Sequence, residues 1–235
     1  MKKIVIVLLL FLISCIGWAQ KRVNEDKLIR RDSIYFLKLN KPFTGIAVKY
    51  NKQGKVVEET SMVDGLENGV YKAYYDSGKL KGIATLKNGK VEGNSWLYFE
   101  DGRIQGFMKI INGLQEGVSK MYYDNGQLLV ETYAEKGKLN GPMKRYYENG
   151  QLEIEVTYKD DEYHGIRKVY YENGNVDFEY HYVDGLRDGE YRDYYKSGQV
   201  KLLRVYRKDK LVGKTIYYDR QGNVIEKLKE EDIEE

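Results

Sequence analysis

Four basic side chains each stand two residues before a tyrosine, and the four pairs recur at a spacing of 24 residues. In a β-strand, residues two apart project from the same face, so each cation would project together with its tyrosine. A line of cations and phenol rings could hold an extended acidic peptide, a glycan or lipid headgroups. The candidate partner-binding residues are therefore Lys120, Tyr122, Lys144, Tyr146, Lys168, Tyr170, Arg192 and Tyr194.

The same basic row, which also contains Lys72, has a second interpretation. Long basic side chains can lay their stems over neighbouring rings while their charges stay in water. In that case the row covers the sheet and holds no ligand. The sequence leaves both interpretations open.

The remaining side chains do not indicate catalysis or metal binding. His164 and His181 are the only histidines, and nothing in their spacing supplies a third ligand or a catalytic partner. No phosphate loop, nucleophile elbow or dinucleotide fingerprint occurs. We expect a non-enzymatic protein with no catalytic residues, no metal site and no cofactor. Because 39 basic residues face 36 acidic ones, we also expect no nucleic-acid partner, which would require concentrated positive charge.

An internal repeat must position the row, because tyrosines and glycines recur with the same period. Self-similarity at a fixed period indicates an array of small units stacked on one another. The tyrosine row is Tyr50, Tyr74, Tyr98, Tyr122, Tyr146, Tyr170, Tyr194 and Tyr218. One glycine row is Gly45, Gly69, Gly93, Gly117, Gly141, Gly165, Gly189 and Gly213; the other is Gly54, Gly78, Gly102, Gly126, Gly150, Gly174, Gly198 and Gly222.

Each unit reads as a β-hairpin. In the unit that begins at Gly141, a short aromatic run reaches residue 147, and Glu148-Asn149-Gly150 separates it from an alternating apolar and polar stretch. Alternation predicts a strand, and a three-residue link with glycine predicts a type I turn that closes in a G1 bulge. Pairing across this link places each row tyrosine opposite an aliphatic residue. That column is Val56, Leu80, Ile104, Leu128, Leu152, Val176, Val200 and Val224.

Other features predict details of the array. A second aromatic set directly follows the row and should lie on the opposite face, so that either the sheet curls or one face is for a partner. The first and last turns, Asn51–Gly54 and Asp219–Gly222, read as longer than the others. Residues 33–39 with Pro42 read as the second half of an incomplete preceding unit. The second set is Tyr75, Phe99, Tyr123, Tyr147, Tyr171 and Tyr195.

The predicted fold is all-β: an elongated, mostly single-layer antiparallel sheet of about eight 24-residue hairpins. We divide the chain into a signal peptide (1–19), an N-terminal segment with a capping strand (20–44), the repeat array (45–225) and a charged tail (226–235). An alternative is a lipoprotein signal over 1–14 that leaves a lipidated Cys15. Either signal predicts export to the periplasm, the outer membrane or the cell exterior.

The pattern Gly-x-x-x-x-Tyr-Tyr-x-Asn-Gly-x-Leu, followed by an apolar strand and a Gly-x-x-x-Gly link, resembles the bacterial variant of the MORN repeat. Its best copies span 117–140, 141–164 and 165–188. The resemblance implies a meandering sheet of hairpins that serves as a scaffold for protein partners or, in some relatives, for acidic lipids. Many such proteins carry an antitoxin label, but an export signal argues against that role here.

These observations predict an exported, non-enzymatic scaffold that binds a protein through an extended tyrosine-rich face. One alternative is a cell-wall or carbohydrate-binding module, although only Trp96 lies inside the array where such repeats use tryptophan. Another is a peripheral binder of acidic phospholipid. The sequence does not identify the partner or the face that binds it.

Overall fold

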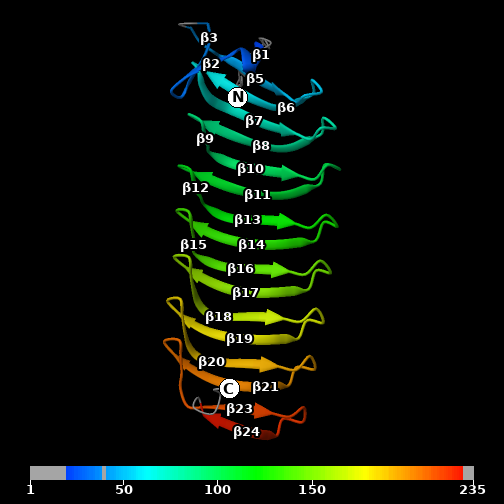
Figure 1. Ribbon diagram of the computed structural model, residues 1–235, viewed down its shortest axis with the longest axis vertical. Coiled ribbons are helices and arrows are strands. Elements are labelled where there is room, and N and C mark those ends of the chain that lie inside the picture. The colour runs from blue at the N-terminus through cyan, green and yellow to red at the C-terminus, as the bar shows by residue number, and fades with distance from the viewer. Residues whose placement is uncertain (1–19, 39–40, 230–235) are drawn as a thin grey trace, which may run out of the picture.

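The computed structural model describes residues 20–38 and 41–229. Apart from a single-turn 3-10 helix, η1 (Glu25–Lys27), every regular element in this part of the chain is a β-strand. The long strands form eight hairpins in chain order (Figure 1). These are β5 (Gly45–Tyr50) with β6 (Val56–Val63), β7 (Leu66–Tyr74) with β8 (Leu80–Lys87), β10 (Gly93–Tyr98) with β11 (Ile104–Ile111), β13 (Gly117–Tyr122) with β14 (Leu128–Glu135), β16 (Gly141–Tyr146) with β17 (Leu152–Lys159), β18 (Glu162–Tyr170) with β19 (Val176–Val183), β20 (Leu186–Tyr194) with β21 (Val200–Arg207), and β23 (Lys214–Tyr218) with β24 (Val224–Lys229).

The hairpins join edge to edge into one antiparallel sheet. The second strand of each hairpin pairs with the first strand of the next, from β6 with β7 through to β21 with β23. The result is an elongated open ribbon with β24 at the end opposite to β5 (Figure 1). The predicted fold class is confirmed. The array extends further than predicted, because β24 continues to Lys229 and so takes four residues that the sequence assigned to the charged tail.

The hairpin turns have the predicted chemistry. In the turn after β7, the backbone N–H of Tyr75 donates to the Lys79 carbonyl (2.9 Å) and that of Gly78 donates to the Tyr75 carbonyl (2.8 Å). Gly78 has a φ of 86°, which a side chain would strain. A bulge follows on the second strand, and every row tyrosine then faces its predicted aliphatic partner. The pairs are Tyr50–Val56, Tyr74–Leu80, Tyr98–Ile104, Tyr122–Leu128, Tyr146–Leu152, Tyr170–Val176, Tyr194–Val200 and Tyr218–Val224.

The first and last turns are not longer, so that prediction was wrong. The backbone N–H of Asn51 donates to Lys55 and that of Asp219 donates to Asn223, both at 2.9 Å, as Tyr75 does to Lys79. Asn51 and Asp219 therefore occupy the place of the second aromatic residue. Their side-chain oxygens accept backbone N–H groups of their own turns, which only a short polar side chain can do there.

The links between hairpins are themselves tight turns. In the link after β19, Asp184 (φ 46°) and Gly185 (φ 80°) both adopt positive φ, as in a type I′ turn. The N–H of Gly185 donates to the Tyr163 carbonyl of the preceding link (2.9 Å), so successive links are joined to each other. In four links the chain after the turn forms a separate short strand. These are β9 (Lys90–Val91), β12 (Leu114–Gln115), β15 (Lys138–Leu139) and β22 (Lys210–Leu211).

The N-terminal segment caps the sheet in a different way from the prediction. The edge beside β5 is occupied by β1 (Arg22–Asn24), which runs parallel to it with Val23 opposite Ala47. Residues 34–38 are not half of a preceding unit, since they form β3 in a separate small sheet with β2 and β4. This segment packs on a core of Phe43, Ala47 and Met62, each at most 4% exposed, which holds it against the first hairpin. The small sheet consists of β2 (Ile29–Arg31), β3 (Ile34–Lys38) and β4 (Lys41–Pro42).

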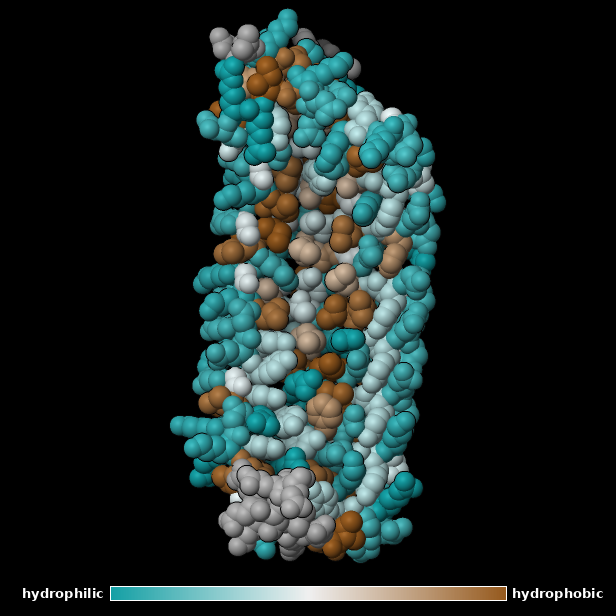
Figure 2. All heavy atoms as spheres, in the orientation of Figure 1, coloured by the Kyte–Doolittle hydropathy of each residue, from teal (hydrophilic) through white to brown (hydrophobic). Residues whose placement is uncertain are grey.

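The two faces of the sheet differ in burial. We call inner the face that carries Ala84, Ala134, Val156, Leu202 and Thr215, which are at most 7% exposed. The outer face carries the row tyrosines and the basic row. A single-layer sheet has no second layer to cover its side chains, so it can bury them this deeply only on a concave face. Small side chains fit such a face because the space there is limited. Figure 2 shows one face on which apolar side chains gather along the middle of the sheet, in a hollow between its edges.

Candidate functional site

The structure places the predicted basic row in one straight column on the outer face, together with acidic residues that the sequence interpretation missed. Lys120 lies opposite Glu131, Glu131 opposite Lys144, and Lys144 opposite Glu155. The alternation continues from Glu155 to Lys168, to Glu179 and to Arg192. Three glutamates thus stand between the four cations. The acidic residues also recur every 24 residues, so the signal was present in the sequence, but only the hairpin register reveals that they face the cations.

Two of these glutamates, Glu131 and Glu179, form ion pairs with the row. Lys120 Nζ lies 2.7 Å from a carboxylate oxygen of Glu131, and Arg192 Nη1 lies 3.0 Å from Glu179. Lys168 Nζ approaches the second oxygen of Glu179 at 3.8 Å. The outer column is therefore close to neutral. Three of its cations, Lys120, Lys168 and Arg192, are paired, whereas Lys144 is exposed and forms no ion pair with a described carboxylate, so the column offers little free positive charge for a cationic groove.

Glu179 is the most enclosed member of the column, with the residue only 7% exposed. Burial opposes its ionisation, but hydrogen bonds from Arg192 and from the hydroxyl of Tyr194 (2.9 Å) hold the pKa of its carboxyl below the ordinary value. Burial and the same contact raise the pKa of Tyr194 to about 12. The row tyrosine Tyr74 donates to Glu59 at 3.0 Å in the same way. At both places the phenol is occupied within the sheet.

The second aromatic set also has a role inside the sheet. Each tyrosine hydroxyl donates to the carbonyl of the row tyrosine in the next unit, at 2.6–2.9 Å. Phe99 has no hydroxyl and interrupts this ladder. The set needs no external partner to explain it, since it ties consecutive units together. The contacts are Tyr75 to Tyr98, Tyr123 to Tyr146, Tyr147 to Tyr170, Tyr171 to Tyr194 and Tyr195 to Tyr218.

The turn asparagines form a second ladder beside the first. The Asn125 side-chain oxygen accepts the backbone N–H of Gln127 (2.8 Å), and its amide nitrogen donates to the Glu148 carbonyl of the next turn (2.8 Å). Asn173 repeats both contacts with Asn175 and Lys196. An aspartate could make only the first contact, which explains why asparagine recurs at this position.

The inner face carries a cluster that the sequence interpretation did not find. Across the neighbouring strands β18 to β21, Arg167 faces Tyr180, Tyr180 faces Tyr191, and Tyr191 faces Arg204. The two tyrosine rings stack with centroids 4.2 Å apart and an interplanar angle of 27°. We call these four residues the Arg–Tyr platform. The alternation of Phe178, Tyr180 and Tyr182 was a signal for it in the sequence.

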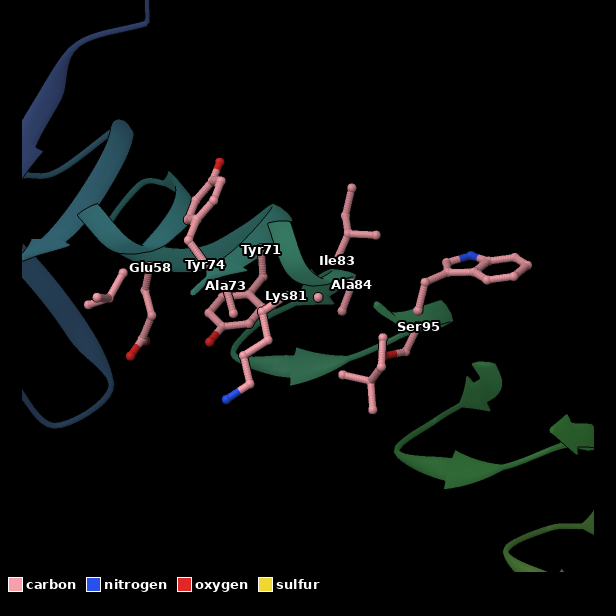
Figure 3. A pocket seen from close by; sticks show the side chains of 12 residues that line it. Glu58, Tyr71, Ala73, Tyr74, Lys81, Ile83, Ala84 and Ser95 are labelled. Carbon is pink, nitrogen blue, oxygen red and sulfur yellow. The ribbon is translucent and has the colours of Figure 1, made fainter. Parts of the chain in front are cut away.

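The thinness of the sheet is visible beside β8. Figure 3 shows Tyr74 and Ile83 projecting from one side of the ribbon, and Lys81 and Ser95 from the other. The residues around this hollow come from both faces, so it is a feature of a single layer and no enclosed chamber. Trp96 lies opposite Ile83 and stacks on Phe107, with ring centroids 5.0 Å apart.

The histidines lie apart from these features. His164 Nδ1 stands 3.5 Å from the Asp184 carboxylate beside a link turn, and His181 packs against Gly189. In the part of the chain that the structure describes, no three potential ligands gather to hold a metal ion. None of its helices is long and apolar enough to cross a membrane. The predicted signal peptide and Cys15 lie outside the described residues.

The similarity of this chain to known proteins lies in its repeat units. The profile of the MORN repeat variant matches five times, over residues 67–88, 115–136, 139–160, 163–184 and 187–208. No curated protein matches the chain. Solved structures with a local likeness include a TcdB2–TccC3–Cdc42 crystal structure (13% identity over 79% of this chain, TM-score 0.21) and a Photorhabdus luminescens Tc holotoxin pore (12% identity over 77%, TM-score 0.20). The chain spans about 12% of the length of each. From its five profile matches and its in-register hairpins, this chain belongs to the MORN repeat variant family.

Proposed function

We propose that this protein is an exported, non-enzymatic scaffold that binds a protein partner along its extended sheet. The observation that carries the proposal is the unbroken register of eight hairpins, which turns repeated side chains into continuous columns on a long surface. Repeat arrays commonly bind partners through such extended surfaces. The proposal includes no catalytic residue, metal or cofactor.

The pattern of internal pairing favours the inner face as the binding face. On the outer face, Glu131 and Glu179 already pair with the predicted cations, and Tyr194 already donates to a carboxylate. An acidic partner would have to displace these contacts before it could bind there. The inner face instead has a hollow lined by Ser95, Met108 and Ile110, and further along the sheet it carries the aromatic and basic side chains of the Arg–Tyr platform, so it offers contact area without the loss of existing ion pairs.

Photo-cross-linking in cells of the source organism tests the proposal. A photoreactive residue would replace Thr132 or Met143 on the inner face, and Glu131 or Lys144 on the outer face as matched controls in the same strands. We expect one protein to be captured from both inner positions and from neither outer position. Capture from no position, with the variants folded and exported, would overturn the proposal.

Export and anchoring form a separate part of the proposal. The expected signal over residues 1–19 supports export, and Cys15 supports the alternative of a lipid anchor. Metabolic labelling with radioactive palmitate tests the anchor, with Cys15→Ser as the control. A labelled parent and an unlabelled variant would support lipidation, whereas an unlabelled but exported parent would support cleavage of an ordinary signal peptide.

A carbohydrate-binding function is the second candidate, and the Trp96–Phe107 pair favours it. Aromatic rings on a sheet face can stack against sugar rings, and this pair interrupts the charged outer column. A pull-down with insoluble cell-wall glycan tests it. Loss of retention in Trp96→Ala, with retention unchanged in Lys144→Gln, would favour the glycan module over the protein scaffold.

A peripheral attachment to acidic phospholipid is a third candidate. It would rest on exposed cations, and salt would weaken it because screening shortens the range of surface charge. Flotation with vesicles that contain phosphatidylserine, at rising salt, tests it. The internal pairing of the outer column predicts little flotation at physiological salt.

The antitoxin role is the least favoured candidate, because the proposed export would separate the protein from a cytosolic toxin.

A further inference from the structure

The Arg–Tyr platform has a regular geometry. Its four side chains occupy one column across four adjacent strands, so Arg167 and Arg204 are separated by three strand spacings. At about 4.8 Å for each spacing, the two positions lie about 14 Å apart along the long axis of the sheet. The stacked rings of Tyr180 and Tyr191 fill the interval between them. The platform therefore combines two cations with a flat aromatic centre.

The two guanidiniums have aromatic and hydroxyl neighbours. Arg167 lies 5.8 Å from the ring centre of Tyr163 and 5.5 Å from that of Phe178. Arg204 donates from Nε to the hydroxyl of Thr215 at 3.3 Å. Among the side chains that the structure describes, neither guanidinium forms an ion pair with a carboxylate. This distinguishes them from Lys120, Lys168 and Arg192 of the outer row, which pair with Glu131 or Glu179.

Two acidic groups on or beside the strands of the platform are already paired with other cations. Asp193, which follows Arg192 on β20, lies 3.3 Å from Lys201, and Asp209 lies 2.9 Å from Arg187. The positive charge of Arg167 and Arg204 is therefore not cancelled by their neighbours. A carboxylate that reached either guanidinium could form the bidentate contact for which arginine is suited.

The phenols of the platform are suited to a neutral, hydrogen-bonding surface. Burial raises the pKa of Tyr191 well above its usual range, so the hydroxyl stays protonated at every physiological pH. Burial also raises the pKa of the neighbouring Tyr182. The rings thus add stacking area and hydroxyl groups without adding negative charge that would repel an anion.

We propose that the Arg–Tyr platform binds an extended acidic peptide segment of the partner protein, which runs along the sheet axis. In an extended chain, residues i and i+4 project from the same side at about 13 Å, close to the separation of the two arginines. Carboxylates at these positions would contact Arg167 and Arg204, and the side chain at i+2 would pack on Tyr180 and Tyr191. This inference rests on the proposed scaffold function and names the chemistry of its partner.

The position of the platform makes it a local site. In the same inner column, the earlier units carry Ala84, Ser95, Ser119, Thr132 and Val156, none of which is charged. An acidic segment would therefore be held at the C-terminal half of the inner face. The remainder of the hollow would contact the less charged parts of the same partner.

Fluorescence anisotropy with a synthetic peptide tests the proposal on the whole folded chain. The probe is Ser-Glu-Ser-Leu-Ser-Glu-Ser with a fluorophore, in which the glutamates are four apart and the leucine lies between them. We expect Arg167→Gln and Arg204→Gln each to weaken binding about 10-fold, as loss of a charge-assisted hydrogen bond does. A probe with glutamine in place of both glutamates should not bind.

Two controls keep the test decisive. Lys168→Gln removes the same charge from the adjacent residue of β18 on the outer face, and it should leave binding unchanged. Arg204→Lys keeps the charge but not the bidentate fork, so a partial loss is expected, and its circular dichroism spectrum shows whether the site still folds. Equal binding by Arg167→Gln and the parent, or equal loss in Lys168→Gln, would overturn the proposal.

An anionic glycan distinguishes the two sources of carboxylate. If an oligogalacturonate binds with the same dependence on both arginines and the peptide does not, the ligand is a glycan and the peptide proposal is wrong.

The photo-cross-linking experiment tests the scaffold function separately from the Arg–Tyr platform. A partner captured from Thr132 and Met143, but no dependence of peptide binding on the arginines, would refute the platform alone.

Discussion

Two parts of the outer face differ in chemistry although they have the same backbone. From Lys120 to Arg192 the central column alternates basic and acidic side chains, whereas one unit earlier Trp96 lies opposite Phe107 and stacks on it. The MORN repeat variant profile matches on either side of that unit but not over residues 89–114. Where the cation is replaced by an aromatic residue, its partner is replaced too. A side chain in this array is therefore suited to its in-register neighbour as well as to its place in the repeat.

Removal of a central carboxylate should give the largest effect. In Glu179→Gln, the cations Lys168 and Arg192 lose the charge that compensates them in a poorly solvated place. We expect the free energy of unfolding to fall by about 3 kcal/mol, in the range for breaking a buried ion pair. Urea unfolding followed by circular dichroism measures this change.

The matched change at Glu131 should be much milder. Its side chain is 36% exposed, against 9% for that of Glu179, and so keeps more contact with water; we expect Glu131→Gln to cost less than about 1 kcal/mol. Equal losses in the two variants would show that burial does not distinguish the two carboxylates and would weaken the comparison.

Conversion of the aromatic unit to the charged type should show coupling between neighbours. Trp96→Lys alone breaks the ring stack and places a charge between Ile83 and Phe107, and we expect it to cost about 2 kcal/mol. Phe107→Glu alone also breaks the stack but gains Lys120 as an opposite-charge neighbour, so we expect it to cost less. The double variant restores an opposite-charge pair at this position. Its loss should be smaller than the sum of the single losses by about 1 kcal/mol. If urea unfolding gave a loss in the double variant equal to the sum of the two single losses, the side chains at these positions would not be coupled, and the comparison above would be wrong.

The interrupted hydroxyl ladder allows a test in both directions. Tyr171→Phe removes the hydroxyl that donates to the Tyr194 carbonyl (2.9 Å), and we expect a loss of about 1 kcal/mol. Phe99→Tyr adds a hydroxyl where the next unit offers the Tyr122 carbonyl, and we expect a gain of about 0.5–1 kcal/mol. Differential scanning calorimetry measures both changes. A lower melting temperature for Phe99→Tyr would show that this unit is not spaced like its neighbours.

The dependence of the unfolding free energy on pH, on the acid side, should give the smallest effect. The pKa of Glu179 is lowered from 4.5 in the folded state, although burial acts in the opposite direction, because Arg192 and Tyr194 hydrogen-bond its ionised form. Its contribution to stability is therefore present above pH 4.5 and is lost as the pH falls through the lowered pKa. The difference in unfolding free energy between the parent and Glu179→Gln should shrink over this range. A difference that does not change with pH would place the effect in packing instead of charge.

Most of the fold could be predicted from the sequence, because hairpin formation is local. The positive φ of Gly78 and its counterparts, the three-residue turns and the pairing of Tyr146 with Leu152 all depend on residues within one unit. The predictions failed at the ends of the array. There, the role of Asn51 depends on side-chain hydrogen bonds, and the place of β3 depends on the core around Phe43.

The candidate site was predicted only in part. The basic row was found, and its residues do share one face with the row tyrosines. Its acidic partners were missed, because Glu131 and Lys144 belong to different hairpins and are neighbours only after these pair. The Arg–Tyr platform was missed for the same reason, since its four residues come from four strands.

By itself, the periodic sequence determined the hairpin, its turn residues and the number of units, because each rests on contacts between residues close together in the chain. Only the tertiary structure decided which charges cancel and which remain, how the second tyrosines tie one unit to the next, and which face is hollow. These properties depend on the register between hairpins and on the curvature of the whole sheet. Both arise when the units pack, and neither belongs to any single unit.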